Sequence, residues 1–121
     1  MGFDATTFGN HEFDFGPDGL ATSIAVAAKA GRTPPIVVSN INLSKDDPTL
    51  VGLQRLTKEG MIRRHLVIER GGLRFGIFGV LGKEAAIYTS SGAASFCDPI
   101  GAAREMLAIL RETEKADVVI A

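Results

Sequence analysis

The chain has 121 residues, of which 45% are hydrophobic and 22% charged, a composition typical of a folded globular protein rather than a disordered or fibrous one. Thirteen basic and fourteen acidic residues leave a formal net charge of -1, which excludes a general electrostatic attraction for nucleic acid or for anionic membranes. Apolar runs are too short to cross a bilayer, no signal-peptide pattern is visible, and a single cysteine excludes an intrachain disulfide and a cysteine-based zinc site. We therefore expect neither nucleic-acid binding nor a membrane span.

The first half of the chain predicts an extended segment, a polar loop, a helix and a strand. Residues 3–8 are extended and lead into a glycine-bounded polar segment, and apolar residues then recur at helical spacing from residue 17 to residue 31. Residues 36–43 are rich in β-branched side chains, which is typical of a buried strand. Residues 44–60 carry few apolar anchors, so we interpret them as a connection with room for one helical turn.

The second half predicts a β-hairpin, a helix and a last strand. Residues 61–69 and 73–80 are apolar runs joined at Gly71 and Gly72, a pattern typical of a hairpin with a tight turn. A helix is expected over 99–115, capped by Asp98, with an apolar stripe made of Ile100, Ala103, Met106, Leu107 and Leu110. Residues 117–121 begin another strand, and Cys97 is expected to be a small packed side chain rather than a reactive thiol.

The most informative segment is 9–16, which reads Gly-Asn-His-Glu-Phe-Asp-Phe-Gly. Asn10 offers a neutral amide oxygen, a hard ligand suited to a divalent cation. His11 can donate a proton or a hydrogen bond to a phosphate oxygen, and Asp14, three residues later, is placed to accept from the other ring nitrogen and hold the imidazole. Glu12 is expected to hold the loop by hydrogen bonds. His11 is thus the candidate general acid and Asp14 its partner, although by themselves these residue types are also typical of polar side chains in a turn between a strand and a helix.

The same eight residues resemble the third signature block of the calcineurin-like metallophosphoesterases, in the extended form found in the 5'-nucleotidase branch. The resemblance implies that Asn10 binds one ion of a two-metal site, that His11 stabilises the phosphoryl transition state and that Asp14 orients His11. It also implies that a metal-bound water attacks phosphorus. Mn, Zn, Mg, Fe and Co are not distinguished by these residues.

The other signature blocks of this family, Asp-x-His and Gly-Asp upstream and two histidine blocks downstream, do not occur in the chain. We therefore expect residues 1–121 to be the central fragment of a single metallophosphoesterase domain, which needs the remaining part of the domain to complete its site. The expected fold is α/β, with a mixed β-sheet flanked by helices, one β-hairpin, and a place in a four-layer αββα arrangement. By itself the fragment should hold no metal and be inactive.

The resemblance implies a metal-dependent phosphomonoester hydrolase of 5'-nucleotidase type that releases phosphate from nucleotides. Asp14 favours this branch, while a related 2',3'-cyclic-nucleotide phosphodiesterase or a thiosulfohydrolase remains an alternative. A different class of alternative is a free-standing binding or structural module without catalysis. His65, Asn40 and Asn42 are interpreted as structural polar residues. Members of the family are often periplasmic or extracellular, and the sequence does not indicate a compartment.

Overall fold

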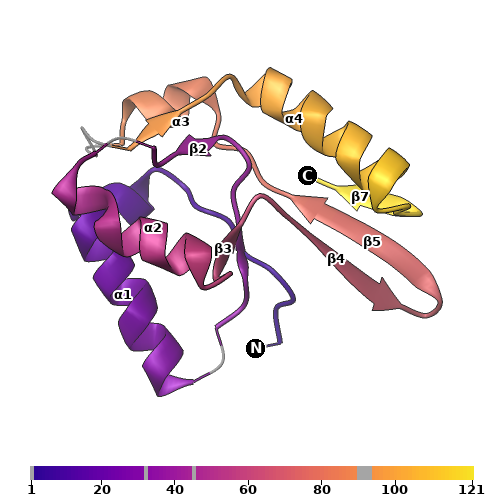
Figure 1. Ribbon diagram of the computed structural model, residues 1–121, viewed down its shortest axis with the longest axis horizontal. Helices are drawn as coiled ribbons and strands as arrows, with labels where there is room; N and C mark the ends of the chain where they lie inside the picture. The colour runs from indigo at the N-terminus through magenta and orange to yellow at the C-terminus, as the bar shows by residue number, and fades with distance from the viewer. Residues whose placement is uncertain (1, 32, 45, 90–93) are drawn as a thin grey trace.

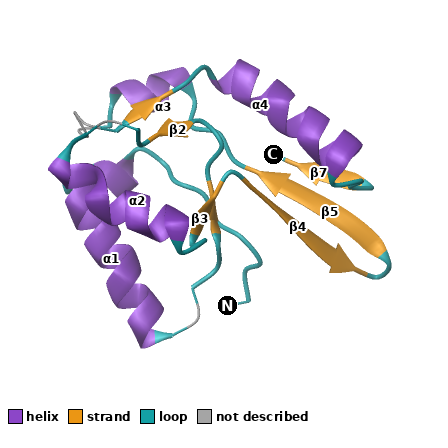
Figure 2. Cartoon of the chain, in the orientation of Figure 1, coloured by secondary structure: helices purple, strands orange, loops and turns teal. Residues whose placement is uncertain are grey.

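The computed structural model describes residues 2–31, 33–44, 46–89 and 94–121 (Figures 1 and 2). In these residues the α-helices are α1 (Gly16–Ala30), α2 (Val51–Lys58), α3 (Lys83–Ile87) and α4 (Pro99–Ala108). Single turns of other helix types are η1 (His11–Phe13), η2 (Pro48–Leu50) and η3 (Ile109–Thr113). The strands are β1 (Ile36–Val37), β2 (Ile41–Asn42), β3 (Ile62–Arg63), β4 (His65–Arg70), β5 (Leu73–Phe78), β6 (Ser95–Phe96) and β7 (Val118–Ile120). The expected α/β class is confirmed.

Within the described residues, the strands are distributed over three small sheets. Strand β1 pairs in parallel with β3, and β2 pairs antiparallel with β6. The third sheet has the order β4-β5-β7, in which β4 is antiparallel and β7 parallel to β5. The pairing is therefore mixed, as the sequence predicts.

The hairpin β4–β5 turns at Gly71 and Gly72, whose φ angles are 59° and 79°. Both lie in the left-handed region, which two-residue hairpin turns of this hand require and which glycine adopts without strain. The predicted hairpin is confirmed. The apolar run 61–69, which the sequence places before the turn as one strand, is divided into β3 and β4, because β3 pairs with β1 instead of β5.

Two hydrophobic clusters form the core. In the first, α1 and α2 pack over β1 and β3 around side chains such as Leu20, Leu53 and Ile62. In the second, α4 and η3 place Met106 and Leu110 on the sheet β4-β5-β7. Figure 1 shows α1 and α2 together at one end of the molecule and α4 beside the sheet at the other. None of the helices described is long and apolar enough to cross a membrane.

The buried side chain of Asn40 joins the segments that connect these clusters. It lies between β1 and β2 and is 1% exposed. Its amide nitrogen donates to the carbonyl oxygens of Leu81 and Cys97, and its oxygen accepts from the Leu81 N–H. Asn40 is thus a structural residue, as expected, and satisfies two buried backbone groups of Leu81 and the part-buried carbonyl of Cys97.

The connection expected over 44–60 is wrong, because this segment contains η2 and the complete helix α2. Leu50, Leu53 and Leu56 are almost fully buried there, and their spacing of three residues places them on one side of the helical segment. The Asp47 side chain accepts from the Thr49 N–H and caps η2. A short amphipathic helix among polar residues therefore supplied more core anchors than the sequence suggested.

Three further expectations change. The strand predicted over 36–43 is divided into β1 and β2 by the turn at Ser39 and Asn40. On α4, Ile100 and Leu107 of the predicted stripe are exposed, whereas Ala102 is buried. Cys97 is exposed rather than packed. The cap by Asp98 is confirmed, since its carboxylate accepts from the Gly101 N–H.

Candidate active site

The segment 9–16 forms a compact loop between an extended stretch and α1. Thr6 bridges to β1, and the chain then makes the single 3-10 turn η1. The N–H groups of Phe13 and Asp14 donate to the carbonyl oxygens of Asn10 and His11, each at 3.1 Å. Gly16 then adopts a φ of 71°, a conformation that favours glycine and lets the chain turn directly into α1.

Glu12 closes this loop from within. Its Oε2 accepts a hydrogen bond of 2.5 Å from the Gly9 N–H. A Cβ at Gly9 would lie only 3.0 Å from the same oxygen, so the absence of a side chain there allows the close approach. Glu12 therefore has the loop-holding contact that the sequence predicts.

Phe13 anchors the loop in the first core cluster. It is fully buried and makes edge-to-face contacts with Phe8 and Phe96, both with ring centroids 5.6 Å apart and with interplanar angles of 78° and 90°. Sequence reasoning missed this role, and for Phe96 no local signal could have shown it. Because the Phe13 ring points inward, its neighbours His11 and Asp14 lie on the exposed side of the turn.

His11 and Asp14 lie within hydrogen-bonding distance, with Nδ1 of the imidazole 3.1 Å from Oδ2 of the carboxylate. An ionised carboxylate only accepts, so this contact requires the proton on Nδ1 and leaves Nε2 as the atom available to a ligand. The two side chains are 83% and 53% exposed, so the pair adds little to stability. What the arrangement provides is an oriented imidazole facing solvent.

Asn10 lies beside this pair at the start of η1. Its side chain is half-buried and makes no capping hydrogen bond to the helical turn. Across the part of the chain that the structure describes, no three His, Cys, Asp or Glu side chains are grouped so as to hold a metal ion. These residues thus supply one neutral oxygen ligand next to an imidazole, and they do not fit a complete metal site without further ligands.

The other polar residues considered in the sequence have structural partners. His65 on β4 is half-buried, with Nε2 3.5 Å from Oε1 of Glu114. Asn42 accepts hydrogen bonds from the N–H and hydroxyl of Ser44. On α4, the Gly101 N–H and then Lys83 lower the pKa of the Asp98 carboxyl, because both stabilise its ionised form. None of these contacts joins the loop of His11.

The chain is similar to proteins of known function and known structure. It is 37% identical over 117 residues to an apyrase of Tabanus yao, a match that covers 97% of this chain and 19% of that protein. It is 33% identical over 140 residues to the trifunctional nucleotide phosphoesterase protein YfkN of Bacillus subtilis, covering 100% of this chain and 10% of the relative. The solved structure of a 5'-nucleotidase precursor from Thermus thermophilus superposes with a TM-score of 0.72 at 26% identity, over 97% of this chain and 20% of that one. No family model matches the chain.

Sequence and fold thus agree on one group of relatives. The chain belongs to the 5'-nucleotidase family of calcineurin-like phosphoesterases. It spans about a fifth or less of the length of these relatives. The three relatives are named as an apyrase, a nucleotide phosphoesterase and a 5'-nucleotidase precursor, and these are names of hydrolytic enzymes that act on nucleotides.

Proposed function

We propose that this chain contributes the His11 loop to a metal-dependent phosphohydrolase of 5'-nucleotidase type, which releases phosphate from nucleotides. The observation that carries the proposal is the 3.1 Å contact between His11 and Asp14 in an exposed loop anchored by Phe13. The names of the relatives support nucleotides as the class of substrate. Asp14 favours phosphomonoesters over cyclic nucleotides within this class.

His11 and Asp14 would work as a pair on the substrate. With its Nδ1 proton directed to Asp14, His11 presents Nε2 to a phosphoryl oxygen and, when protonated, donates a hydrogen bond to it. Asp14 stabilises the resulting imidazolium and fixes its orientation. Asp14 therefore acts through His11, and the loss of either side chain should slow hydrolysis.

Asn10 is placed to be one ligand of a divalent cation. A neutral amide oxygen binds such an ion without adding negative charge, and a bound ion supplies Lewis-acid chemistry to phosphoryl transfer. Since no three His, Cys, Asp or Glu side chains of the described residues are grouped to hold an ion, the remaining ligands would come from elsewhere in the protein. We accordingly propose that residues 1–121 form the central part of a single metallophosphoesterase domain.

The test uses the complete gene product, assayed for phosphate release from nucleoside mono-, di- and triphosphates, a 2',3'-cyclic nucleotide and a thiosulfate ester, with Mn²⁺ or Mg²⁺ present. His11→Ala should lower kcat about 10²- to 10⁴-fold, the range supplied by one acid–base group. The matched control is His65→Ala, which removes the other histidine of the chain and should leave kcat within about threefold. Equal activity of His11→Ala and the parent would rule out the assignment. No turnover of any substrate by the parent would support the non-catalytic module.

A further inference from the structure

The contact between Phe13 and Phe96 joins the His11 loop to a strand more than eighty residues later in the sequence. Phe13 is the buried side chain of η1, whereas His11 and Glu12 in the same turn are exposed. The position of the loop relative to the core therefore depends on how the Phe13 ring is held. Among its edge-to-face partners, Phe8 is in the preceding extended segment and Phe96 is on β6.

Backbone pairing and a buried amide hold Phe96 in place. On β6, Phe96 pairs with Ile41 of β2 in an antiparallel register. The next residue, Cys97, donates its N–H to the Asn40 carbonyl at 2.8 Å and accepts from the Asn40 side chain at 3.1 Å. Since Asn40 is buried and also binds Leu81 through both side-chain atoms, this support is rigid.

We propose that Phe96 is a positioning residue for His11. It acts through the Phe13 ring: β6 holds Phe96, Phe96 holds Phe13, and Phe13 sets where the turn carrying His11 and Asp14 lies. The expected effect on kcat rests on the proposed function, whereas the expected effect on the position of the turn does not. Loss of the aromatic edge loosens the turn, so His11 spends less time in the productive orientation while substrate binding through other groups is retained.

The test compares Phe96→Leu with Phe75→Leu in the complete gene product. Phe75 is also half-buried and also lies on a strand, but β5 belongs to the sheet β4-β5-β7 and not to the pair β2-β6 that carries Phe96, so it is a matched control. Two quantities are measured: amide hydrogen exchange at Phe13 and Asp14, whose N–H groups close the turn, and kcat and KM for the best nucleotide substrate. In Phe96→Leu both exchange rates should rise and kcat should fall, each by about two- to tenfold, with KM within about twofold of the parent.

Two more variants separate positioning from general loss of packing. Phe96→Tyr keeps the ring, and because Phe96 is half-buried the added hydroxyl has a route to solvent, so this variant should behave like the parent. Phe96→Met keeps side-chain bulk but removes the ring. It should reproduce the loss of kcat seen in Phe96→Leu, with a smaller loss of stability than in Phe96→Leu.

The outcomes distinguish this proposal from the proposed function. If the parent hydrolyses nucleotides and Phe96→Leu matches Phe75→Leu in exchange and in kcat, the positioning role is overturned and the function stands. If exchange at Phe13 and Asp14 rises only in the variants at Phe96 that lack the ring, while the parent hydrolyses nothing, the function fails and the positioning of the turn stands. A fall in kcat in Phe96→Tyr equal to that in Phe96→Leu would also contradict the proposal.

Discussion

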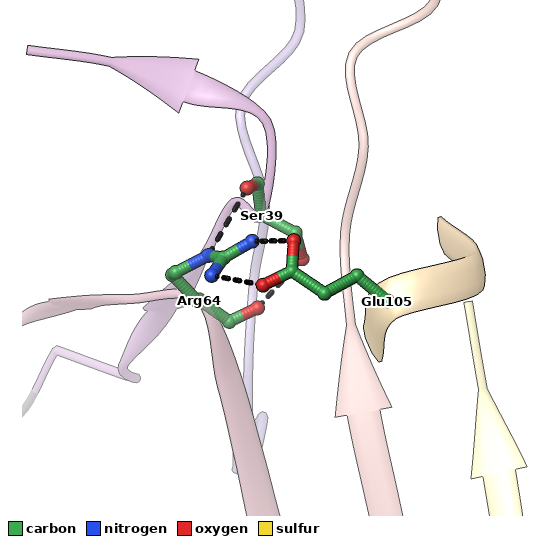
Figure 3. Close-up of polar contacts among 3 residues, drawn as sticks. All are labelled: Ser39, Arg64 and Glu105. Carbon is green, nitrogen blue, oxygen red and sulfur yellow. Dashed lines mark hydrogen bonds and ion pairs between the residues drawn. The ribbon is translucent and has the colours of Figure 1, made fainter. Parts of the chain in front are cut away.

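Arg64 and Glu105, 41 residues apart in the sequence, form a two-pronged ion pair in which both terminal guanidinium nitrogens contact the carboxylate, at 2.7 and 2.6 Å (Figure 3). Arg64 also bonds Ser39 through its backbone, since its carbonyl oxygen accepts from the Ser39 hydroxyl at 2.6 Å. The group therefore joins the β3–β4 junction, the β1–β2 segment and α4. The hydrogen bond from Arg64 lowers the pKa of the Glu105 carboxyl, and the same bond raises the pKa of the Arg64 guanidinium.

Glu105→Gln is expected to lower the thermal midpoint modestly at pH 7, by no more than about 5 °C, because the pair is half-exposed. The folded-state pKa of Glu105 is depressed, so its contribution is present above the unfolded value near 4.5 and is lost as pH falls through the folded value. The difference between parent and variant should therefore shrink towards pH 3. Thermal denaturation at pH 7 and pH 3 measures this, with the exposed Glu112→Gln as control. A difference that grew on acidification would contradict the pairing.

Asn40→Ala should reduce the free energy of unfolding by about 2–4 kcal/mol, because it removes two buried hydrogen bonds to the backbone of Leu81 and a part-buried one to the Cys97 carbonyl. Asn42→Ala is the control. Among the described residues, the Asn42 side chain bonds the neighbouring Ser44, and these two hydrogen bonds are exposed, so their loss should cost less than about 1 kcal/mol. Urea denaturation of both variants gives the comparison, and equal costs would show that Asn40 does not join the segments as described.

Gly79→Ala should be strongly destabilising. A Cβ at Gly79 would lie 2.5 Å from both the Val37 carbonyl oxygen and the Thr7 hydroxyl, and the backbone atom cannot move aside cheaply. We expect a loss of about 1–3 kcal/mol or more. Gly82→Ala, where no atom lies within 4 Å of the new Cβ, should change stability by less than about 0.5 kcal/mol. Denaturant midpoints of the two variants should differ clearly, and similar midpoints would disprove the close approach of Gly79 to Val37 and Thr7.

Asp14→Asn should lower kcat for nucleotide hydrolysis about ten- to hundredfold, because the amide can hydrogen-bond the imidazole in the wrong sense and no longer stabilises its charge. Steady-state kinetics of the complete gene product measure this, with the largest change expected in kcat. Asp18→Asn, an exposed acidic residue in the first turn of α1, is the control and should remain near the parent. If the two variants had equal kcat, Asp14 would have no role through His11.

Local patterns in the sequence determined much of the architecture. The hairpin follows from Gly71 and Gly72, which permit left-handed φ angles, and the start of α4 follows from the Asp98 cap before a proline. The contact of His11 with Asp14 was also expected, because both lie in one short turn. In each case the decisive contacts lie within a few residues of one another, so their physical cause is present in the local sequence.

Local patterns were misleading where burial depends on distant partners. Leu53 anchors α2 because α1 packs over it, and the division of 36–43 follows from Asn40 reaching Leu81 and Cys97. No local rule distinguishes the exposed Ile100 from the buried Met106 on α4.

The sequence alone therefore determined the family, the α/β class and the identity of the loop carrying His11. Only the tertiary structure decided how that loop is held, since the contact of Phe13 with Phe96 and the pairing of Arg64 with Glu105 bring together segments far apart along the chain. The physical reason is that propensity and turn chemistry act over a few residues. Packing and long-range hydrogen bonds depend on which surfaces meet after the chain has folded.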